Sequence, residues 1–288
     1  MVDPFETYRA YLFSIAYRML GTTMDAEDMV QETYLRYRAT PLEAIASPKA
    51  FLITILTRLC MDQLHLARRQ RETYLGPWLP EPISDAAALE AANPEERVDT
   101  EESVSLAFLV LLEQLQPLER AVFLLREVFE YDYAEIATFL GKSEMACRQA
   151  FSRARKRLVD HRPRFSASRE THQQMLVSFL RAVQAGDMNA LMNLLSEDVT
   201  LWADGGGKVK GAATHPVSGN VAVARFSVGA TRRFLPQDYR VAVEEVNREP
   251  SIVIRGEDRA YLVLTIEVEA LRIRTVRIIV NPEKLTHV

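Results

Sequence analysis

The sequence predicts a multi-domain fold, in which two all-α domains, the second with a helix-turn-helix, precede an α+β domain. Apolar residues recur at helical spacing over the first half of the chain. Strand-like alternation then dominates the last third, over residues 199–203, 239–246, 251–255, 260–270 and 272–280. A proline-containing acidic stretch interrupts the helical half. The 288 residues and the hydrophobic content of 48% allow two or three compact domains with normal cores.

Residues 131–158 read as two helices joined by a tight turn, the pattern of a helix-turn-helix. Gly141 suits the left-handed end of the first helix, and Ser143 suits the cap of the second. The second helix carries an apolar stripe of Cys147, Ala150, Ala154 and Leu158, and polar side chains cover its other faces. Basic residues gather from Arg148 to Arg164, which favours a polyanionic partner. An ordinary helical hairpin on a solvated surface is the alternative.

Two helices are expected over residues 5–39, with Gly21 ending the first and acidic residues opening the second. One face of the second helix is polar, with Asp28, Gln31, Glu32 and Arg36 at helical spacing. Periodicity alone favours a merely solvated face there.

A long helix is expected from Lys49 to Arg71. Arg58, Asp62, His65 and Arg69 share one stripe of it, and Arg68 adds to a basic C-terminal end. Cations at a helix C-terminus are favourable without any ligand, so this basic patch has a structural explanation as well as a functional one.

Residues 76–102 hold four prolines and many acidic side chains, which predicts a linker between domains. Trp78 is unusual there, because an indole is seldom left in water without a surface to cover. It either docks the linker or pads a neighbouring helix. The predicted domains are residues 1–75, 103–165 and 166–288, separated in the helical half by this linker.

The net charge of −4 means that any polyanion must bind to local basic patches. Cys60 and Cys147 fall among apolar neighbours in helices and are expected to be buried thiols. No leader sequence or membrane span is recognised, so a cytoplasmic location is expected.

The sequence has no Walker A loop, zinc-spaced cluster or nucleophile elbow, so no metal, cofactor or catalytic residue is predicted. Asp204 and His215 could form an acid–base pair, but we favour the simpler interpretation of a Gly-rich turn and a loop histidine.

With these segments in view, the chain resembles the extracytoplasmic-function (ECF) sigma factors of bacterial RNA polymerase, and within them the SigJ-like subgroup with a fused SnoaL-like domain. The match rests on DAEDMVQETYLR (25–36), SPKAFLITILTRLCMDQLHLARRQRE (47–72) and the helix-turn-helix (130–158). Three shorter motifs indicate the subgroup, namely WLPEP (78–82), DGGGK (204–208) and NPEKL (281–285). The last motif departs from the subgroup at Glu283, where Asp is expected, and the charge is kept.

The resemblance implies a role for each set of residues. The first segment would dock on core polymerase through Asp28, Gln31, Glu32 and Arg36. The second would face the minus-10 element through Arg58, Asp62, His65, Arg68 and Arg69. The helix-turn-helix would face the minus-35 element through Ser143, Glu144, Arg148, Gln149 and Ser152, with Arg153, Arg155 and Lys156 on phosphates. Regulatory contacts between domains would use Trp78, Leu79, Pro80, Glu81, Pro82, Asp204, Gly205, Gly206, Gly207, Lys208, Asn281, Pro282, Glu283, Lys284 and Leu285.

The function that the resemblance implies is promoter-directed initiation by core RNA polymerase, without covalent chemistry, under control of the chain's own SnoaL-like cone in place of a separate anti-sigma factor. The implied partners are promoter DNA and the β′ clamp and β flap of core polymerase, with no membrane partner and a monomeric free state. A small-molecule ligand of the C-terminal domain is left open, as are a cyclase-like enzyme, a ligand sensor and a conventional repressor.

Overall fold

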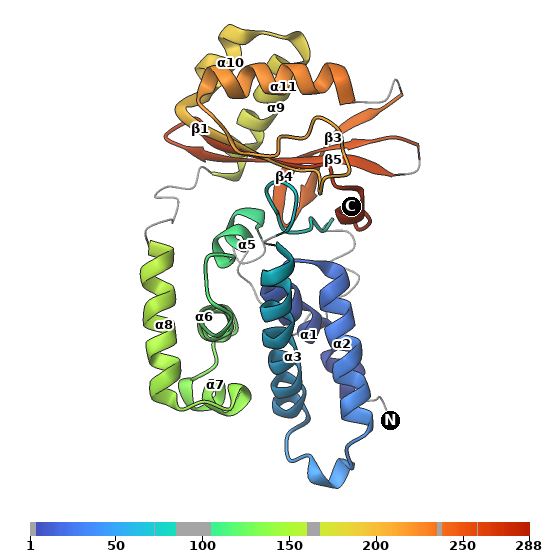
Figure 1. Ribbon diagram of the computed structural model, residues 1–288, viewed down its shortest axis with the longest axis vertical. Helices are drawn as coiled ribbons and strands as arrows, with labels where there is room; N and C mark the ends of the chain where they lie inside the picture. The colour runs from blue at the N-terminus through green and yellow to red at the C-terminus, as the bar shows by residue number, and fades with distance from the viewer. Residues whose placement is uncertain (1–3, 72, 85–104, 160–167, 235–237, 258) are drawn as a thin grey trace. The chain divides into compact units, whose positions relative to one another are not determined.

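The computed structural model describes residues 4–71, 73–84, 105–159, 168–234, 238–257 and 259–288 (Figure 1). Its contacts divide the chain into two compact units. Unit 1 contains residues 1–72 and 88–162, and unit 2 contains residues 73–87 and 163–288. The predicted linker 76–102 is therefore divided, because its first part belongs to unit 2 and residues 85–102 lie outside the described ranges.

The first part of unit 1 is a bundle of three α-helices: α1 (Pro4–Leu20), α2 (Thr23–Arg38) and α3 (Pro48–Arg71), with a short 3₁₀ turn η1 (Leu42–Ala44) between the last two. The chain turns between α1 and α2 at Gly21, whose positive φ of 78° few other residues adopt easily. Leu12, Ile15, Leu52 and Leu56 form the fully buried centre of the bundle. The expected helices and their apolar faces are thus confirmed here.

The sequence reading wrongly excluded a segment long and apolar enough to cross a membrane. Residues Pro48–Ala67 of α3 pass that test, with a mean hydropathy of 1.3 over the most apolar window. In the structure α3 packs against α1, α2, α6 (Pro117–Phe123) and α7 (Tyr133–Leu140). Its apolar character is therefore that of a central core helix.

The second part of unit 1 contains α5 (Leu106–Leu112), α6, the π-helix η4 (Leu124–Val128), α7 and α8 (Glu144–Val159). Helix α6 starts at Pro117 and is capped by Gln116 and Glu119. It does not continue as one α-helix, because its hydrogen bonding changes to the π pattern after Phe123. The helix-turn-helix is formed by α7 and α8.

A buried arginine ties the two parts of unit 1 together. Arg120 of α6 is 2% exposed, and its Nε and Nη2 atoms donate to the Arg18 carbonyl of α1 at 3.2 and 3.0 Å. Its Nη1 atom donates to Glu113 at 2.5 Å. Burial lowers the pKa of Arg120. The ion pair with Glu113 and the two bonds to a carbonyl nonetheless favour the charged form.

Unit 2 is an α+β domain, as predicted. Its six-stranded sheet has the order β2-β1-β6-β5-β4-β3, and every neighbouring pair is antiparallel except β1 with β6. The strands are β1 (Leu195–Asp204), β2 (Val217–Ser218), β3 (Arg240–Val246), β4 (Glu249–Arg255), β5 (Ala260–Glu269) and β6 (Arg272–Ile279). Helices α9 (Arg169–Ala185), α10 (Met188–Leu194) and α11 (Asn220–Phe234) cover one face of the sheet (Figure 1).

Helix α11 and strand β2 were not predicted. The segment NVAVARFSVGATRRF contains Gly and β-branched residues, which are weak helix formers in isolation. Its helical state depends on tertiary packing, because Val223 and Ala224 are fully buried against the rest of the unit.

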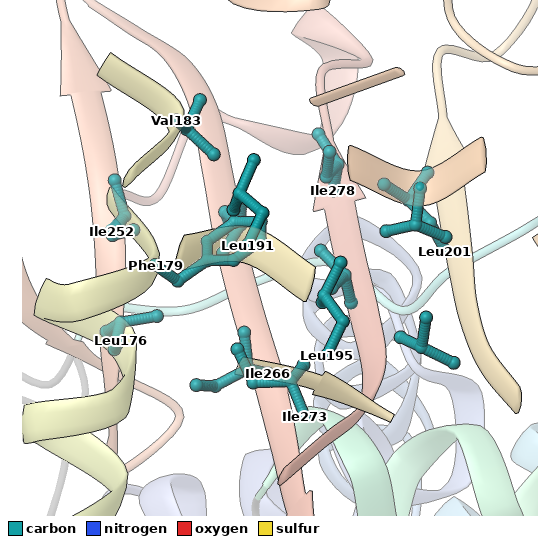
Figure 2. Packing of buried hydrophobic residues seen from close by; sticks show 14 of the residues in the cluster. Leu176, Phe179, Val183, Leu191, Leu195, Leu201, Ile252, Ile266, Ile273 and Ile278 are labelled. Carbon is teal, nitrogen blue, oxygen red and sulfur yellow. The ribbon is translucent and has the colours of Figure 1, made fainter. Parts of the chain in front are cut away.

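The core of unit 2 lies between the helices and the sheet. Phe179 from α9, Leu191 from α10 and Ile266 from β5 meet in this layer (Figure 2). The two cysteines belong to unit 1. Both are buried free thiols, as expected, and burial raises the pKa of each.

Candidate functional site

A buried carboxylate holds the linker stretch 73–84 on the C-terminal domain within unit 2. Asp204 is the last residue of β1 and is fully buried. Its Oδ1 atom accepts from the Tyr74 hydroxyl at 2.5 Å and the Gly206 amide at 3.1 Å. Its Oδ2 atom accepts from the Leu79 amide at 2.8 Å and the Lys284 Nζ at 2.7 Å. Four donors therefore satisfy a charge that would be costly to bury alone.

Lys284 supplies the positive charge opposite Asp204. It is 6% exposed, and besides the carboxylate its Nζ atom donates to the Leu79 carbonyl at 2.5 Å. The same ammonium lies 4.2 Å from the ring centroid of Trp78 and 5.2 Å from that of Tyr74. The linker thus surrounds the lysine with two aromatic rings and one carbonyl, all of which stabilise a cation.

The Gly-rich turn after Asp204 fits closely against the C-terminal segment. A Cβ atom on Gly206 would lie 2.5 Å from the Asn281 Nδ2 atom, and one on Gly207 would lie 2.9 Å from the Leu75 side chain. Both glycines also have positive φ angles, of 57° and 72°. Asn281 Nδ2 donates to the Tyr74 hydroxyl at 3.1 Å. Only glycine at these two positions permits both the turn and the close approach.

A second group of contacts holds the end of the stretch. The Ile83 amide donates to Asn247 Oδ1 at 3.0 Å, and the Asn247 amide donates to the Ile83 carbonyl at 2.9 Å. Ser84 forms an isolated antiparallel bridge with Val246. The linker therefore adds a short strand-like segment beside the β3–β4 turn.

Glu81 supplies the last contact of this set. Its side chain is buried, and its Oε1 atom lies 3.0 Å from His287 Nδ1. We call all these contacts the linker latch. It is formed by Tyr74, Trp78, Leu79, Glu81 and Ile83 on the linker and by Asp204, Gly206, Asn247, Asn281, Lys284 and His287 on the domain.

The structure brings together all three short motifs that the sequence singled out. Leu79, Pro80, Glu81 and Pro82 are buried, as are Gly205 and Leu285. Lys208, Pro282 and Glu283 are exposed, and Lys208 pairs with Glu283 on the surface.

Four residues of the linker latch were missed: Tyr74, Ile83, Asn247 and His287. Tyr74 shares a short aromatic stretch with Trp78, a signal that could have been used. The hydroxyl of Tyr74 donates to Asp204, and burial together with this bond raises its pKa. Asn247 and His287 carried no local signal.

The structure separates Asp204 from the acid–base pair considered for it. Among the described residues, the hydrogen bonds of its carboxylate all go to the linker latch, while His215 is exposed and its Nδ1 atom lies 3.1 Å from the Thr214 hydroxyl. The explanation of a turn and a loop histidine fits better.

In unit 1, the polar face of α2 is largely exposed. Asp28, Gln31 and Arg36 are exposed, and Glu32 is half-buried and pairs with Arg36 at 2.8 Å. The opposite face carries the buried Val30, so the face that sequence reasoning singled out is free of core contacts.

The stripe on α3 is exposed at Arg58, Asp62 and His65, and the side chains of Arg68 and Arg69 lie outside the described part of the structure. Arg58 also contacts the helix-turn-helix, because its Nε atom donates to the Phe139 carbonyl of α7 at 3.2 Å. A Cβ atom on Gly141 would lie 3.3 Å from its Nη2 atom. Arg58 thus occupies the C-terminal end of α7, where a cation is favoured.

The helix-turn-helix has the local geometry predicted for it. Gly141 ends α7 in the left-handed conformation, with φ 61° and ψ 40°. The Ser143 hydroxyl accepts from the Ala146 amide at 3.2 Å at the start of α8. The predicted stripe of Cys147, Ala150, Ala154 and Leu158 is buried. The predicted reading face is exposed at every position: Ser143, Glu144, Arg148, Gln149, Ser152, Arg153, Arg155 and Lys156.

One member of that set has an internal partner. The Arg153 Nε atom donates to the buried Glu119 at 3.0 Å, and Arg157 pairs with the same carboxylate at 3.2 Å. Arg148 is held instead by exposed contacts, with Glu144 at 3.4 Å and with the Tyr133 ring at 4.3 Å. Arg153 is therefore committed to fixing α8 on α6.

Comparison with known families assigns both helical parts of unit 1. Residues 4–72 match the family model "Sigma-70 region 2", and residues 105–158 match the model "Sigma-70, region 4". The polar stripe of α3 therefore lies in sigma-70 region 2, and the helix-turn-helix lies in sigma-70 region 4.

The whole chain is similar to curated sigma factors. It is 40% identical to the ECF RNA polymerase sigma factor SigJ of Mycobacterium tuberculosis, over 82% of this chain and 74% of the relative. It is 31% identical to the probable ECF sigma factor SigI of the same organism, over 97% and 93%. The crystal structure of M. tuberculosis SigJ matches with a TM-score of 0.75 and 36% identity, covering 98% of this chain and 97% of that one.

These matches and the two sigma regions define a promoter-specificity subunit of the sigma-70 class. The chain belongs to the ECF RNA polymerase sigma factors. It directs RNA polymerase to promoters at transcription initiation, and it shares the SigJ architecture with the C-terminal sheet domain included.

Proposed function

We propose that promoter recognition is divided among three faces of unit 1. Core polymerase would dock on the α2 face through Asp28, Gln31, Glu32 and Arg36. The α3 stripe, with Arg58, Asp62, His65, Arg68 and Arg69, would hold the minus-10 DNA. The start of α8, with Ser143, Glu144, Arg148, Gln149 and Ser152, would enter the minus-35 major groove, with Arg155 and Lys156 on phosphates.

The exposure of those side chains that the structure describes supports this division, and Arg153 is the exception. Because Arg153 is paired with the buried Glu119, we assign it to stabilising α8 rather than to phosphate binding.

The remaining partners follow from this assignment. Core polymerase would contact the protein through its β′ clamp and β flap in the cytoplasm, and the free protein would be monomeric. Copurification of core polymerase with the wild-type chain but not with Asp28→Lys would support the docking face, provided that both proteins have the same circular dichroism.

The C-terminal domain would act as a gate. The carrying observation is the linker latch, in which Asp204 and Lys284 hold the linker through the amide and carbonyl of Leu79. In unit 1 Arg58, a residue of the proposed minus-10 stripe, donates to the Phe139 carbonyl of the helix-turn-helix. While the contact between Arg58 and Phe139 is kept, the two DNA-reading regions would be unable to engage two separate promoter elements at once.

The length of the linker between α3 and α5 also favours a gate. Residues 73–104 could reach about 110 Å when fully extended, but residues 85–104 alone reach at most about 70 Å. Two elements on the order of 25 base pairs apart are separated by about 85 Å of duplex. While residues 73–84 are held on the domain, they add only their fixed end-to-end distance to the reach of residues 85–104, so the two DNA-reading regions can separate less.

Run-off transcription with core polymerase tests the gate. Asp204→Asn should raise initiation, because it weakens the bonds to Leu79 and Lys284 without changing the shape of the side chain. Lys208→Ala, which removes only the surface pair with Glu283, is the matched control and should leave initiation unchanged. Truncation at Ser166 removes the domain, and truncation before Asn281 removes Lys284. The gate is refuted if Asp204→Asn and both truncations initiate at the wild-type rate.

We also propose that unit 2 performs no chemistry of its own. The Asp204 carboxylate is buried and bonded to four donors, and the exposed His215 is hydrogen-bonded to the Thr214 hydroxyl instead. Small-molecule turnover by the wild-type chain that disappears in Asp204→Ala would contradict this assignment.

A further inference from the structure

Unit 2 contains a cavity between its helices and its sheet. Its volume is about 90 Å³. Phe179 and Val183 of α9, Phe226 of α11 and Ile252 of β4 line it; Figure 2 shows Phe179, Val183 and Ile252 in the surrounding core. Cavities with such apolar walls stay empty of water and bind apolar molecules, as an engineered cavity of about 150 Å³ binds benzene.

The described lining has few polar side chains, namely those of Gln184, Ser227 and Tyr239. Gln184 and Tyr239 are exposed, so they mark an opening to solvent. Ser227 is buried, and its hydroxyl donates to the Val223 carbonyl at 2.8 Å. Among the described residues of the lining none is charged, so a charged ligand would lose its hydration there without gaining an opposite charge. The walls therefore select an uncharged, mainly apolar molecule with a polar group at the opening.

The cavity wall is also part of the linker latch. Ala203 lines the cavity and precedes Asp204. Val280 lines it and precedes Asn281, and the amides of both Val280 and Asn281 donate to the Asp204 carbonyl, at 2.9 and 3.0 Å. One side of these short segments thus faces the cavity, while the other holds the linker.

The loop after the Gly-rich turn forms another part of the cavity wall and packs closely against that turn. Val209 and Ala212 line the cavity. A Cβ atom on Gly205 would lie 2.6 Å from the Ala212 Cβ, so the loop is in close contact with the turn. A molecule that displaces Ala212 must therefore displace Gly205, and with it Gly206 beside Asn281.

We propose that this cavity binds a small, uncharged and mainly apolar molecule, and that its occupancy releases the linker latch. The cavity would then be the input of the gate, with the ligand favouring the released state by binding it more tightly than the latched one. The consequence for transcription rests on the proposed gate, but ligand binding and linker release do not require it.

Trp78 reports on release directly. It lies under the Lys284 ammonium in the latched state, and Trp202 is the other tryptophan of the chain. The full-length Trp202→Phe variant therefore has Trp78 as its single tryptophan. The probe is borneol, an uncharged bicyclic alcohol that does not absorb where tryptophan is excited. Camphorsulfonate, an anion with a similar apolar skeleton, is the control ligand.

Calorimetric titration should show that borneol binds and camphorsulfonate does not. Saturating borneol should shift the Trp78 emission to longer wavelength and increase its quenching by acrylamide. Ala230→Leu, which fills the cavity from α11, should weaken binding roughly tenfold or more. Ala222→Leu, the same change at an exposed position of the same helix, should bind as the parent does. If Ala230→Leu loses its native circular dichroism, Val241→Phe fills the cavity from β3 instead.

The absence of borneol binding overturns the proposal, and so does binding that leaves the Trp78 emission unchanged. Binding that survives both cavity-filling changes also overturns it. Failure of the gate is a different result: Trp78 would respond to borneol, while Asp204→Asn and the two truncations would transcribe as the wild type does.

Discussion

The change Lys284→Met isolates the charge that holds the linker latch together. Methionine keeps the apolar stem of the lysine side chain up to Cε, but it lacks the ammonium that lies over the Trp78 and Tyr74 rings. The variant loses the bonds of Nζ to Asp204 at 2.7 Å and to the Leu79 carbonyl at 2.5 Å. Asp204, which is fully buried, keeps its other three donors but no opposite charge. Removing one partner of a buried ion pair costs roughly 3–5 kcal/mol.

Amide hydrogen exchange measures this loss at the linker itself. The Leu79 and Ile83 amides donate to Asp204 and Asn247, so both are protected while the latch is closed. Because 1.4 kcal/mol is a factor of ten, their exchange should become about 100- to 4,000-fold faster in Lys284→Met. Lys208→Met is the matched control, since its surface ion pair contributes less than about 1 kcal/mol.

The double variant Asp204→Asn with Lys284→Met completes the test. It removes both charges, so it should recover a large part of the protection that Lys284→Met loses. The reasoning is refuted if Lys284→Met exchanges at Leu79 no faster than the Lys208→Met control. It is also refuted if the double variant is as unprotected as the sum of the two single changes.

Three further predictions concern other contacts. Tyr74→Phe, which removes the hydroxyl that bridges two latch residues, should lower the free energy of unfolding of the full chain by about 1–2 kcal/mol in denaturant titrations, and an unchanged midpoint would contradict it. Lys156→Ala should reduce the slope of log K against log salt for promoter-DNA binding by about one. Arg153→Ala should leave that slope unchanged and lower the free energy of unfolding by about 1 kcal/mol, because Glu119 loses one of its partners. Equal slopes for both variants would refute the distinction. Burial lowers the pKa of His172, whose Nε2 atom has no hydrogen-bond partner among the described residues, so the folded state favours the neutral imidazole. Its contribution to the free energy of unfolding should be complete above the unfolded pKa of about 6.5 and should fall as the pH drops from there toward the lower folded pKa. His172→Phe should remove this part of the pH dependence of the thermal midpoint.

The elements of unit 1 could be predicted from the sequence because their signals are local. The residues Cys147, Ala150, Ala154 and Leu158 recur at helical spacing. Position 141 is a glycine, the residue type that most readily adopts the left-handed conformation at a helix end. The π-helix after Phe123 was not predictable in this way, since its residues read as a continuous α-helix.

The contacts of the linker-latch residues could not be predicted from the sequence. The sequence named Trp78, Asp204 and Lys284 through a family resemblance, but residues separated by more than a hundred positions carry no mutual signal in a single chain. Tyr74 and Asn247 contribute a hydroxyl and an amide whose importance depends entirely on what they face. The internal pairing of Arg153 is of the same kind, because an exposed arginine on a basic helix looks identical whether or not a buried glutamate lies beneath it.

The sequence by itself determined the order of domains, the helix periods, the helix-turn-helix and the sigma-factor character of the chain. Tertiary structure alone decided that the linker stretch 73–84 belongs to the C-terminal unit, that α11 is helical and that one cavity wall continues into the linker latch. The physical reason is the range of the interactions. Periodicity and capping act within a few residues, whereas a buried charge is stabilised only by the donors that folding brings to it from distant parts of the chain.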